Sequence, residues 1–123
     1  MARNSILVID DVSENVKLIR IALTREGYDI RTAYDAEQAL AILQSFKPDL
    51  ILLDIQLPGM SGVELSRQLK SDPSTQDIKI IAFSAYATKR DEEEMLAAGC
   101  DGYISKPVDT NTLAEAIEKF LKS

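Results

Sequence analysis

The feature that most constrains this chain is a short aliphatic segment, Leu50–Leu53, which stands between two acids, Asp49 and Asp54. Four consecutive aliphatic residues without alternation predict a strand that is covered on both faces, the usual condition of a central parallel strand. Asp54 then lies at the carboxyl edge of that strand, before a turn rich in Pro and Gly at residues 56–62. Because open α/β sheets bind ligands outside these strand ends, we expect the rest of the chain to place groups around Asp54.

The composition narrows the classes of protein that the chain can represent. Its 123 residues predict one domain, 1–123, and its first residues run straight into a strand, so we expect a cytoplasmic protein without a signal peptide. The absence of histidine and the single cysteine, Cys100, exclude an internal disulfide, Ser-His-Asp catalysis and a thiolate zinc cluster. No apolar run is long enough to span a membrane, and the net charge of −6 argues against nucleic-acid binding.

Four further strands and five helices complete the expected fold. The other strands are predicted at residues 5–9, 28–34, 79–83 and 102–105. Residues that can cap the five helices are Ser13, Asp35, Ser61, Thr88 and either Asp109 or Thr110. Gly27, Pro48 and Gly99 are expected to end the first, second and fourth helices. This alternation predicts a doubly wound α/β sandwich with a five-stranded parallel sheet in the flavodoxin-like order 2-1-3-4-5.

The expected strand order brings polar residues to one edge of the sheet. Asp10 and Asp11 follow the first strand, Asp54 ends the third, Ser84 follows the fourth and Lys106 follows the fifth. Three carboxylates within a few ångströms of one another need a counter-charge. An all-oxygen site without His or Cys suits a hard divalent cation, and Mg²⁺ is the expected ion.

Specific roles follow for the residues of this edge. We expect Asp11 and Asp54 to bind the metal directly, Asp10 to act mainly through water, and the backbone carbonyl of Gln56 to add a ligand. Asp54 would also be the nucleophile, because a carboxylate that attacks phosphorus forms an acyl phosphate.

Lys106 has two possible functions. It could be a structural ion pair in an acidic cluster, or it could hold a phosphoryl group in transfer together with the Ser84 hydroxyl. The Lys106–Pro107 bond is also a candidate cis peptide.

As a set, these residues resemble the receiver domain of two-component response regulators. The matching residues extend from the first strand to the last: Asp10-Asp11, Asp54, Pro58–Gly62, Ser84-Ala85, Tyr103 and Lys106-Pro107. Within that family, the run Asp54–Pro58 and the ending Gly99–Pro107 look most like single-domain regulators of the DivK type. CheY-like and hybrid-kinase receivers share these features.

The resemblance implies that Asp54 accepts a phosphoryl group from a phosphohistidine on a histidine kinase or a phosphotransfer protein. Asp10 and Asp11 would hold Mg²⁺, and Lys106 would pair with the phosphoryl group. Ser84 would move to hydrogen-bond that group, and this movement would open space into which Tyr103 turns. The reshaped surface, formed by the fourth helix, fifth strand and fifth helix, would bind a downstream protein.

The same resemblance implies no enzymatic activity beyond self-catalysed phosphorylation and dephosphorylation, at a rate that Gln56 and Tyr86 would tune. Because the chain ends soon after the last predicted helix, we expect no output domain. Signalling through a protein partner is then the first expectation. A phosphate shuttle or sink in a phosphorelay, or a receiver fragment of a hybrid histidine kinase, is the alternative.

Three other classes compete with a receiver. Phosphatases of the haloacid dehalogenase type have Asp-x-Asp, whereas Gln56 stands two residues after Asp54. A flavodoxin-like electron carrier needs a phosphate-binding loop where Asp10 and Asp11 would repel a phosphate. A pseudo-receiver that is never phosphorylated would not need the complete set of acids, Ser84 and Lys106.

Overall fold

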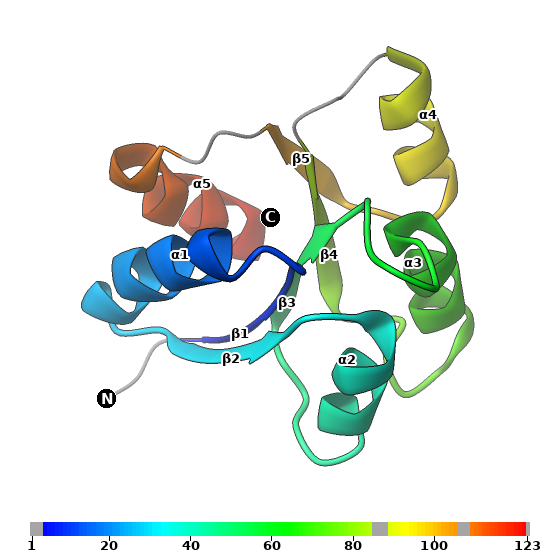
Figure 1. Ribbon diagram of the computed structural model, residues 1–123, viewed down its shortest axis with the longest axis horizontal. Coiled ribbons are helices and arrows are strands. Elements are labelled where there is room, and N and C mark those ends of the chain that lie inside the picture. Colours follow the sequence, from blue (N-terminus) through cyan, green and yellow to red (C-terminus); the bar gives the residue numbers. More distant parts are fainter. Residues whose placement is uncertain (1–3, 85–88, 106–108, 123) are drawn as a thin grey trace.

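The structure, a computed structural model, describes residues 4–84, 89–105 and 109–122, and the side chains of Ser84 and Thr110 are not among the described atoms. Within these residues, one parallel sheet lies between two layers of helices, as predicted (Figure 1). The sheet has the order β2-β1-β3-β4-β5, with β1 (Ser5–Ile9), β2 (Asp29–Ala33), β3 (Leu50–Asp54), β4 (Lys79–Ser84) and β5 (Gly102–Ser105). The helices are α1 (Ser13–Arg25), α2 (Ala36–Leu43), α3 (Gly62–Ser71), α4 (Lys89–Ala97) and α5 (Thr110–Lys122).

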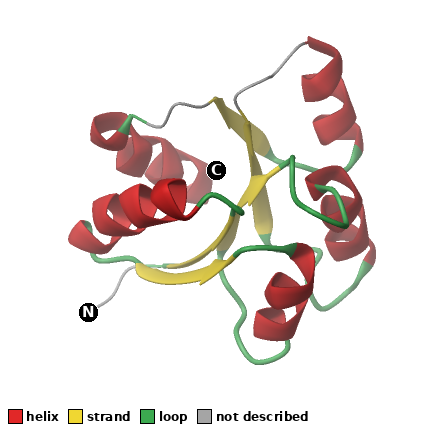
Figure 2. Cartoon of the chain, viewed as in Figure 1, coloured by secondary structure: helices red, strands yellow, loops and turns green. Residues whose placement is uncertain are grey.

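The central strand β3 is buried along its whole length, which confirms the prediction from its unbroken aliphatic run. Leu50 and Leu52 face the core beneath α1 and α5, and Ile51 and Leu53 face the core beneath α2, α3 and α4. Figure 2 shows this division of the helices between the two faces of the sheet. Because alternate side chains of β3 enter the cores on opposite faces of the sheet, this one strand packs against both helix layers and holds them together.

The edge strand β2 has the mixed pattern expected of a strand with one open side. Ile30 and Ala33 are buried, whereas Arg31 is exposed. In register, β2 pairs only with β1, from Ser5↔Asp29 to Ile9↔Ala33. The backbone N–H of Asp10 continues this ladder by donating to the carbonyl oxygen of Ala33 at 3.1 Å. The backbone of Asp10 is therefore held by the sheet, one residue beyond the end of β1.

Three of the predicted helix caps are confirmed. The side chain of Asp35 accepts from the Gln38 backbone N–H at 2.8 Å, and Ser61 accepts from that of Glu64 at 3.2 Å. Of the two alternatives for α5, Asp109 precedes the helix and accepts from the Asn111 N–H at 2.9 Å. The predicted cap Thr88 lies outside the described residues.

Two of the predicted helix boundaries were wrong. The N-cap of α1 is Val12 rather than Ser13, and it makes no side-chain cap hydrogen bond. The carboxylate of Asp10 instead accepts from the Val12 N–H, so the chain before α1 is fixed from the sheet side. Pro48 does not end α2, because that helix stops at Leu43, and Pro48 lies buried in the connection to β3.

No described helix combines the length and apolar character needed to cross a membrane. The helices that end at Arg25 and Ala97 stop two residues before Gly27 and Gly99, close to the predicted positions.

Candidate functional site

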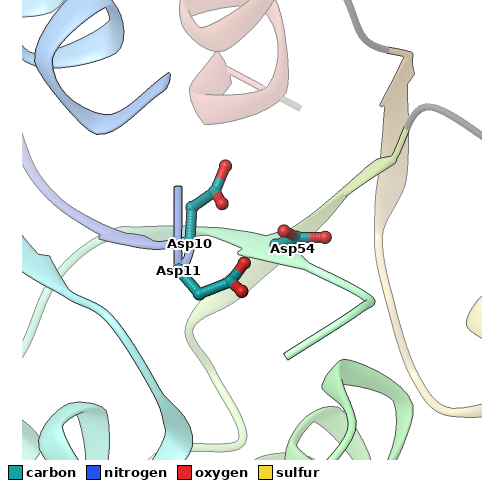
Figure 3. A group of neighbouring side chains, drawn as sticks. All are labelled: Asp10, Asp11 and Asp54. Carbon is teal, nitrogen blue, oxygen red and sulfur yellow. The ribbon is translucent and has the colours of Figure 1, made fainter. Parts of the chain in front are cut away.

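Three carboxylates converge where β1 and β3 end side by side. Asp10 and Asp11 directly follow β1, and Asp54 is the last residue of β3, one position beyond the Ile9↔Leu53 pair. One carboxylate oxygen from each residue lies within 4.8 Å of the others (Figure 3). We call these three residues the acidic cluster. The predicted convergence of the acids at one sheet edge is therefore confirmed.

The three acids differ in their exposure to water. Asp10 is fully buried and Asp54 is 3% exposed, whereas Asp11 is exposed. A buried carboxylate is stable only where hydrogen bonds or opposite charge compensate its desolvation. The acidic cluster therefore has two buried carboxylates, Asp10 and Asp54, and one carboxylate that is open to solvent, Asp11.

Asp10 accepts two hydrogen bonds from the beginning of α1. The Val12 backbone N–H donates to Oδ1 at 2.9 Å, and the Asn15 side-chain amide donates to Oδ2 at 3.2 Å. Asn15 was not predicted as a site residue, because a lone Asn in the first turns of a helix matches no known site motif. The only signal in the sequence is that Asn15 follows Asp10 by five residues.

Asp54 is held by the turn that follows β3. The Gln56 N–H donates to its Oδ1 at 3.0 Å, and the Gly62 N–H closes the turn on the Ile55 carbonyl oxygen at 2.9 Å. A Cβ on Gly62 would come within 2.4 Å of the Asp54 carbonyl oxygen, so no side chain fits there. Gly62 was predicted as part of the turn and of the receiver match Pro58–Gly62, but its close contact with the backbone of Asp54 was not predicted from the sequence.

The donor set of the acidic cluster fits a hard divalent cation. Its potential ligands are carboxylate oxygens, and hard cations such as Mg²⁺ prefer oxygen ligands. One exposed acid leaves an approach from solvent, and the two buried acids supply negative charge in a region of low dielectric. The cluster is thus compatible with a metal ion.

Other predicted site residues lie at the same edge of the sheet or beyond the described residues. Ser84 is the last residue of β4, directly after the Asp54↔Phe83 pair, so its backbone lies beside the acidic cluster. The Ser84 side chain and residues 86, 106 and 107 lie outside the described atoms. The roles of Ser84, Tyr86 and Lys106, and the cis form of the Lys106–Pro107 bond, stay predictions.

Tyr103 lies on β5 and is partly buried against the core beneath α2, α3 and α4. Burial is the main cause that raises the pKa of its phenol, and the negative charges of Glu92 and Asp91 on α4 raise it further. The ring thus lies close to α4, on the surface that the resemblance assigns to signalling.

The comparisons with known proteins agree with this arrangement. The sequence model of the response regulator receiver domain matches residues 6–118. The chain belongs to this family. It is also 38% identical over 117 residues to the polar-differentiation response regulator DivK of Brucella anthropi, with 95% of each chain covered.

Solved structures show the same fold. A CheY-like receiver domain protein from Methanospirillum hungatei JF-1 is 32% identical, with a TM-score of 0.90 over 98% of this chain and 95% of that one. The receiver domain of the sensor histidine kinase PA1611 from Pseudomonas aeruginosa PAO1 is 29% identical, with a TM-score of 0.89 over 99% and 100% of the two chains. The latter structure has a magnesium ion coordinated in its active-site cleft. The chain is thus a receiver domain of the two-component type.

Proposed function

We propose that this protein is a cytoplasmic single-domain response regulator, with its receiver domain spanning residues 1–123, that accepts a phosphoryl group on Asp54. The donor is the phosphohistidine of a histidine kinase or a phosphotransfer protein. The observation that carries the proposal is the convergence of Asp10, Asp11 and Asp54 within 4.8 Å of one another at the end of β1 and β3. In a receiver fold, this is the edge where a ligand can approach the strand ends.

The proposed metal ligands are Asp11 and Asp54 directly, Asp10 mainly through water, and the backbone carbonyl of Gln56. The exposure of Asp11 and the burial of Asp10 support this division. A bound Mg²⁺ supplies positive charge that offsets the charge of the carboxylates and of a phosphoryl group. The magnesium ion in the PA1611 receiver supports the choice of ion.

In the proposed reaction, a carboxylate oxygen of Asp54 forms a bond to phosphorus while the bond between phosphorus and the donor's imidazole nitrogen breaks. The electron pair of the broken bond stays on the imidazole nitrogen, and the donor ring, which carries a proton on its other nitrogen, leaves as neutral histidine, so that the second product is an aspartyl phosphate. The hydrogen bond from the Gln56 N–H to Oδ1 fixes the Asp54 carboxylate before attack. Lys106 and the Ser84 hydroxyl would hold the phosphoryl oxygens, and we propose no other enzymatic activity.

We further propose that phosphorylation is transmitted to a downstream protein through α4, β5 and α5. Ser84 would move toward the phosphoryl group, and Tyr103 would turn into the space that it leaves. Tyr103 packs against the core that includes Met95 of α4, and the charges of Glu92 and Asp91 raise the pKa of its phenol, which supports a coupling between β5 and α4. The charge of the phosphoryl group on Asp54 would then shift the equilibrium between two arrangements of the α4, β5 and α5 surface.

A second candidate function is supported by one observation. The similar PA1611 receiver belongs to a sensor histidine kinase, so this chain could instead serve as a phosphate shuttle or sink, or as the receiver of a hybrid kinase. Phosphoryl transfer from the phosphorylated protein onward to a phosphotransfer protein would distinguish this function, because a terminal regulator would keep its phosphoryl group or release it to water.

The test of the main proposal is the intact mass of the protein after incubation with acetyl phosphate and Mg²⁺. We expect a gain of one phosphoryl group, about 80 Da, in the wild type. Asp54→Asn and an EDTA-treated sample should show no gain. Asp49→Asn is a matched control, because it makes the same substitution at the residue directly before the other end of β3. Absence of the gain under conditions that label another receiver domain would contradict the proposal.

A further inference from the structure

We propose that Asn15 is a positioning residue for the divalent cation of the acidic cluster, and that it acts by holding the carboxylate of Asp10. This inference rests on the proposed function, since it assumes that the cluster binds a cation. It adds a residue from α1 to the acidic cluster at the ends of β1 and β3.

The contacts of Asp10 carry the inference. Asp10 is fully buried, and each of its carboxylate oxygens accepts a hydrogen bond from the start of α1. Val12 N–H binds Oδ1 at 2.9 Å, and Asn15 Nδ2 binds Oδ2 at 3.2 Å. Donors on both oxygens restrict the rotation of the carboxyl group, and Asn15 supplies the hydrogen bond from α1 to Oδ2. Asn15 therefore helps to fix the orientation of the Asp10 carboxylate within the acidic cluster.

The position of Asn15 in the helix explains how it reaches the site. Side chains of a helix tilt toward its N-terminus, so an Asn at the third residue of α1 points back toward the connection from β1. Asn is a weaker helix former than Ala or Leu, so the stability of α1 alone does not favour it there. Its contribution is the hydrogen bond to Asp10.

The chemistry of the amide suits a cation site. A neutral donor holds Asp10 without cancelling its charge, so the attraction of the cluster for a cation is preserved. A lysine in the same place would compete with the cation, and a leucine would leave Oδ2 without this donor in a buried environment. Groups that orient metal ligands in this way typically change metal affinity by about 10- to 100-fold when they are removed.

The test measures cation binding directly, on the full chain. Mn²⁺ binding is followed by electron paramagnetic resonance, with Mg²⁺ as competitor, for wild type, Asn15→Leu and Asn15→Ala. Asn111→Leu is the matched control, because Asn111 is an exposed residue at the second position of α5. The melting temperature without metal shows that each variant is folded.

We expect both Asn15 variants to raise the dissociation constants for Mn²⁺ and Mg²⁺ about tenfold, with Asn111→Leu unchanged. A second readout separates positioning from general damage. Phosphorylation by acetyl phosphate should need about tenfold more Mg²⁺ for its half-maximal rate, while the rate at saturating Mg²⁺ stays close to that of the wild type.

Three outcomes would overturn the inference. Unchanged cation affinity in folded Asn15 variants would show that the hydrogen bond does not matter for binding. A maximal rate that falls together with the melting temperature would assign Asn15 a structural role only. A wild-type protein that binds no cation would remove the proposed function and this inference together, which distinguishes that failure from the first two.

Discussion

Two polar clusters of this molecule collect charged side chains of different kinds. The first is the acidic cluster at the ends of β1 and β3. The second, which we call the Lys70 network, consists of Lys70, Asp101 and the backbone of Ile78 and Ile80. There, Lys70 Nζ lies 2.9 Å from Asp101 Oδ2 and donates to the Ile78 carbonyl oxygen at 2.8 Å. Asp101 Oδ2 also accepts from the Ile80 N–H at 2.9 Å.

The difference lies in the sign of the charges that each cluster collects. The Lys70 network pairs one cation with one anion and joins α3, the beginning of β4 and the connection between α4 and β5. The acidic cluster gathers three groups of the same sign, and its two buried members accept hydrogen bonds from the neutral donors Val12 N, Asn15 Nδ2 and Gln56 N. The opposite charges of the Lys70 network attract each other, whereas the like charges of Asp10, Asp11 and Asp54 repel one another and so favour the binding of a cation.

The largest loss of stability is expected from a substitution at Gly62, because the backbone of Asp54 and Ile55 lies too close to accept a side chain there. Gly62→Ala would place a Cβ 2.4 Å from the Asp54 carbonyl oxygen and 2.6 Å from the Ile55 Cα, so the backbone must move. We expect a loss of about 3 kcal/mol in the free energy of unfolding, measured by urea denaturation.

Gly99→Ala is the matching substitution at the Lys70 network. Its Cβ would meet the flexible Lys70 side chain at 2.7 Å, and its φ of 93° carries the strain of a left-handed conformation. We expect a smaller loss, about 1 kcal/mol. Equal losses for the two variants would contradict the view that the turn after Asp54 is built against rigid backbone.

The next largest loss of stability is expected from removal of the Lys70 charge, which pairs with Asp101. Lys70→Met keeps the length of the side chain but removes the donor to Asp101 and Ile78, and we expect a loss of about 2 kcal/mol in the free energy of unfolding. The buried Cys100 thiol, next to this network in the chain, should then react faster with a thiol reagent. Lys47→Met, at an exposed loop position, is the control. An unchanged stability would show that the network is a surface feature only.

Neutralising one acid in each cluster should change stability in opposite directions. In EDTA, Asp54→Asn relieves repelling charge and keeps an oxygen that can accept from Gln56 N–H, so we expect a gain of about 1 kcal/mol. Asp101→Asn removes the partner of Lys70 and should destabilise the protein. Thermal unfolding of both variants is the measurement, and a loss of stability in both would refute the contrast between the clusters.

Adding Mg²⁺ should raise the melting temperature of the wild type, because a ligand that binds only the folded state stabilises it. The melting temperature of Asp54→Asn should rise less.

The smallest contribution to stability is expected from the raised pKa of the Tyr103 phenol. Folding raises the pKa of its phenol above the ordinary value of 10.0, first through burial and then through Glu92 and Asp91. The neutral phenol is thus favoured in the folded state, so this contribution to stability is complete below pH 10 and is lost as the pH rises through the folded pKa. Glu92→Gln should lower the pKa of Tyr103, measured by the ultraviolet absorbance of the phenolate against a Tyr103→Phe reference. An unchanged pKa would mean that α4 does not act on this ring.

Much of the fold was predictable because it depends on patterns that local sequence carries. The aliphatic run before Asp54 indicated a strand covered on both faces, and the alternation from Tyr28 to Tyr34 indicated an edge strand. Asp35 and Ser61 marked helix starts, because capping is a contact between near neighbours. The strand order then placed Asp10, Asp11 and Asp54 together, since parallel strands end at one edge.

The predictions that failed had two causes. Ser13 has the chemistry of a cap, but the Asp10 carboxylate accepts from the Val12 N–H two residues on, a local contact that Asp residues often make. The hydrogen bond from Asn15 and the close packing of Gly62 on Asp54 depend instead on the three-dimensional arrangement of β1, α1 and the turn after β3. Sequence patterns identify the acids of the site, whereas the groups that orient them emerge only from the packed structure.

The most direct test of the central claim is to locate the phosphoryl group chemically. Protein treated with acetyl phosphate and Mg²⁺ is reduced with borohydride, which converts an aspartyl phosphate to homoserine, and its peptides are sequenced by mass spectrometry. Our account predicts homoserine at position 54, and none there when EDTA replaces Mg²⁺. Homoserine at position 10 or 11 instead, or an equal yield at position 54 without Mg²⁺, would contradict it.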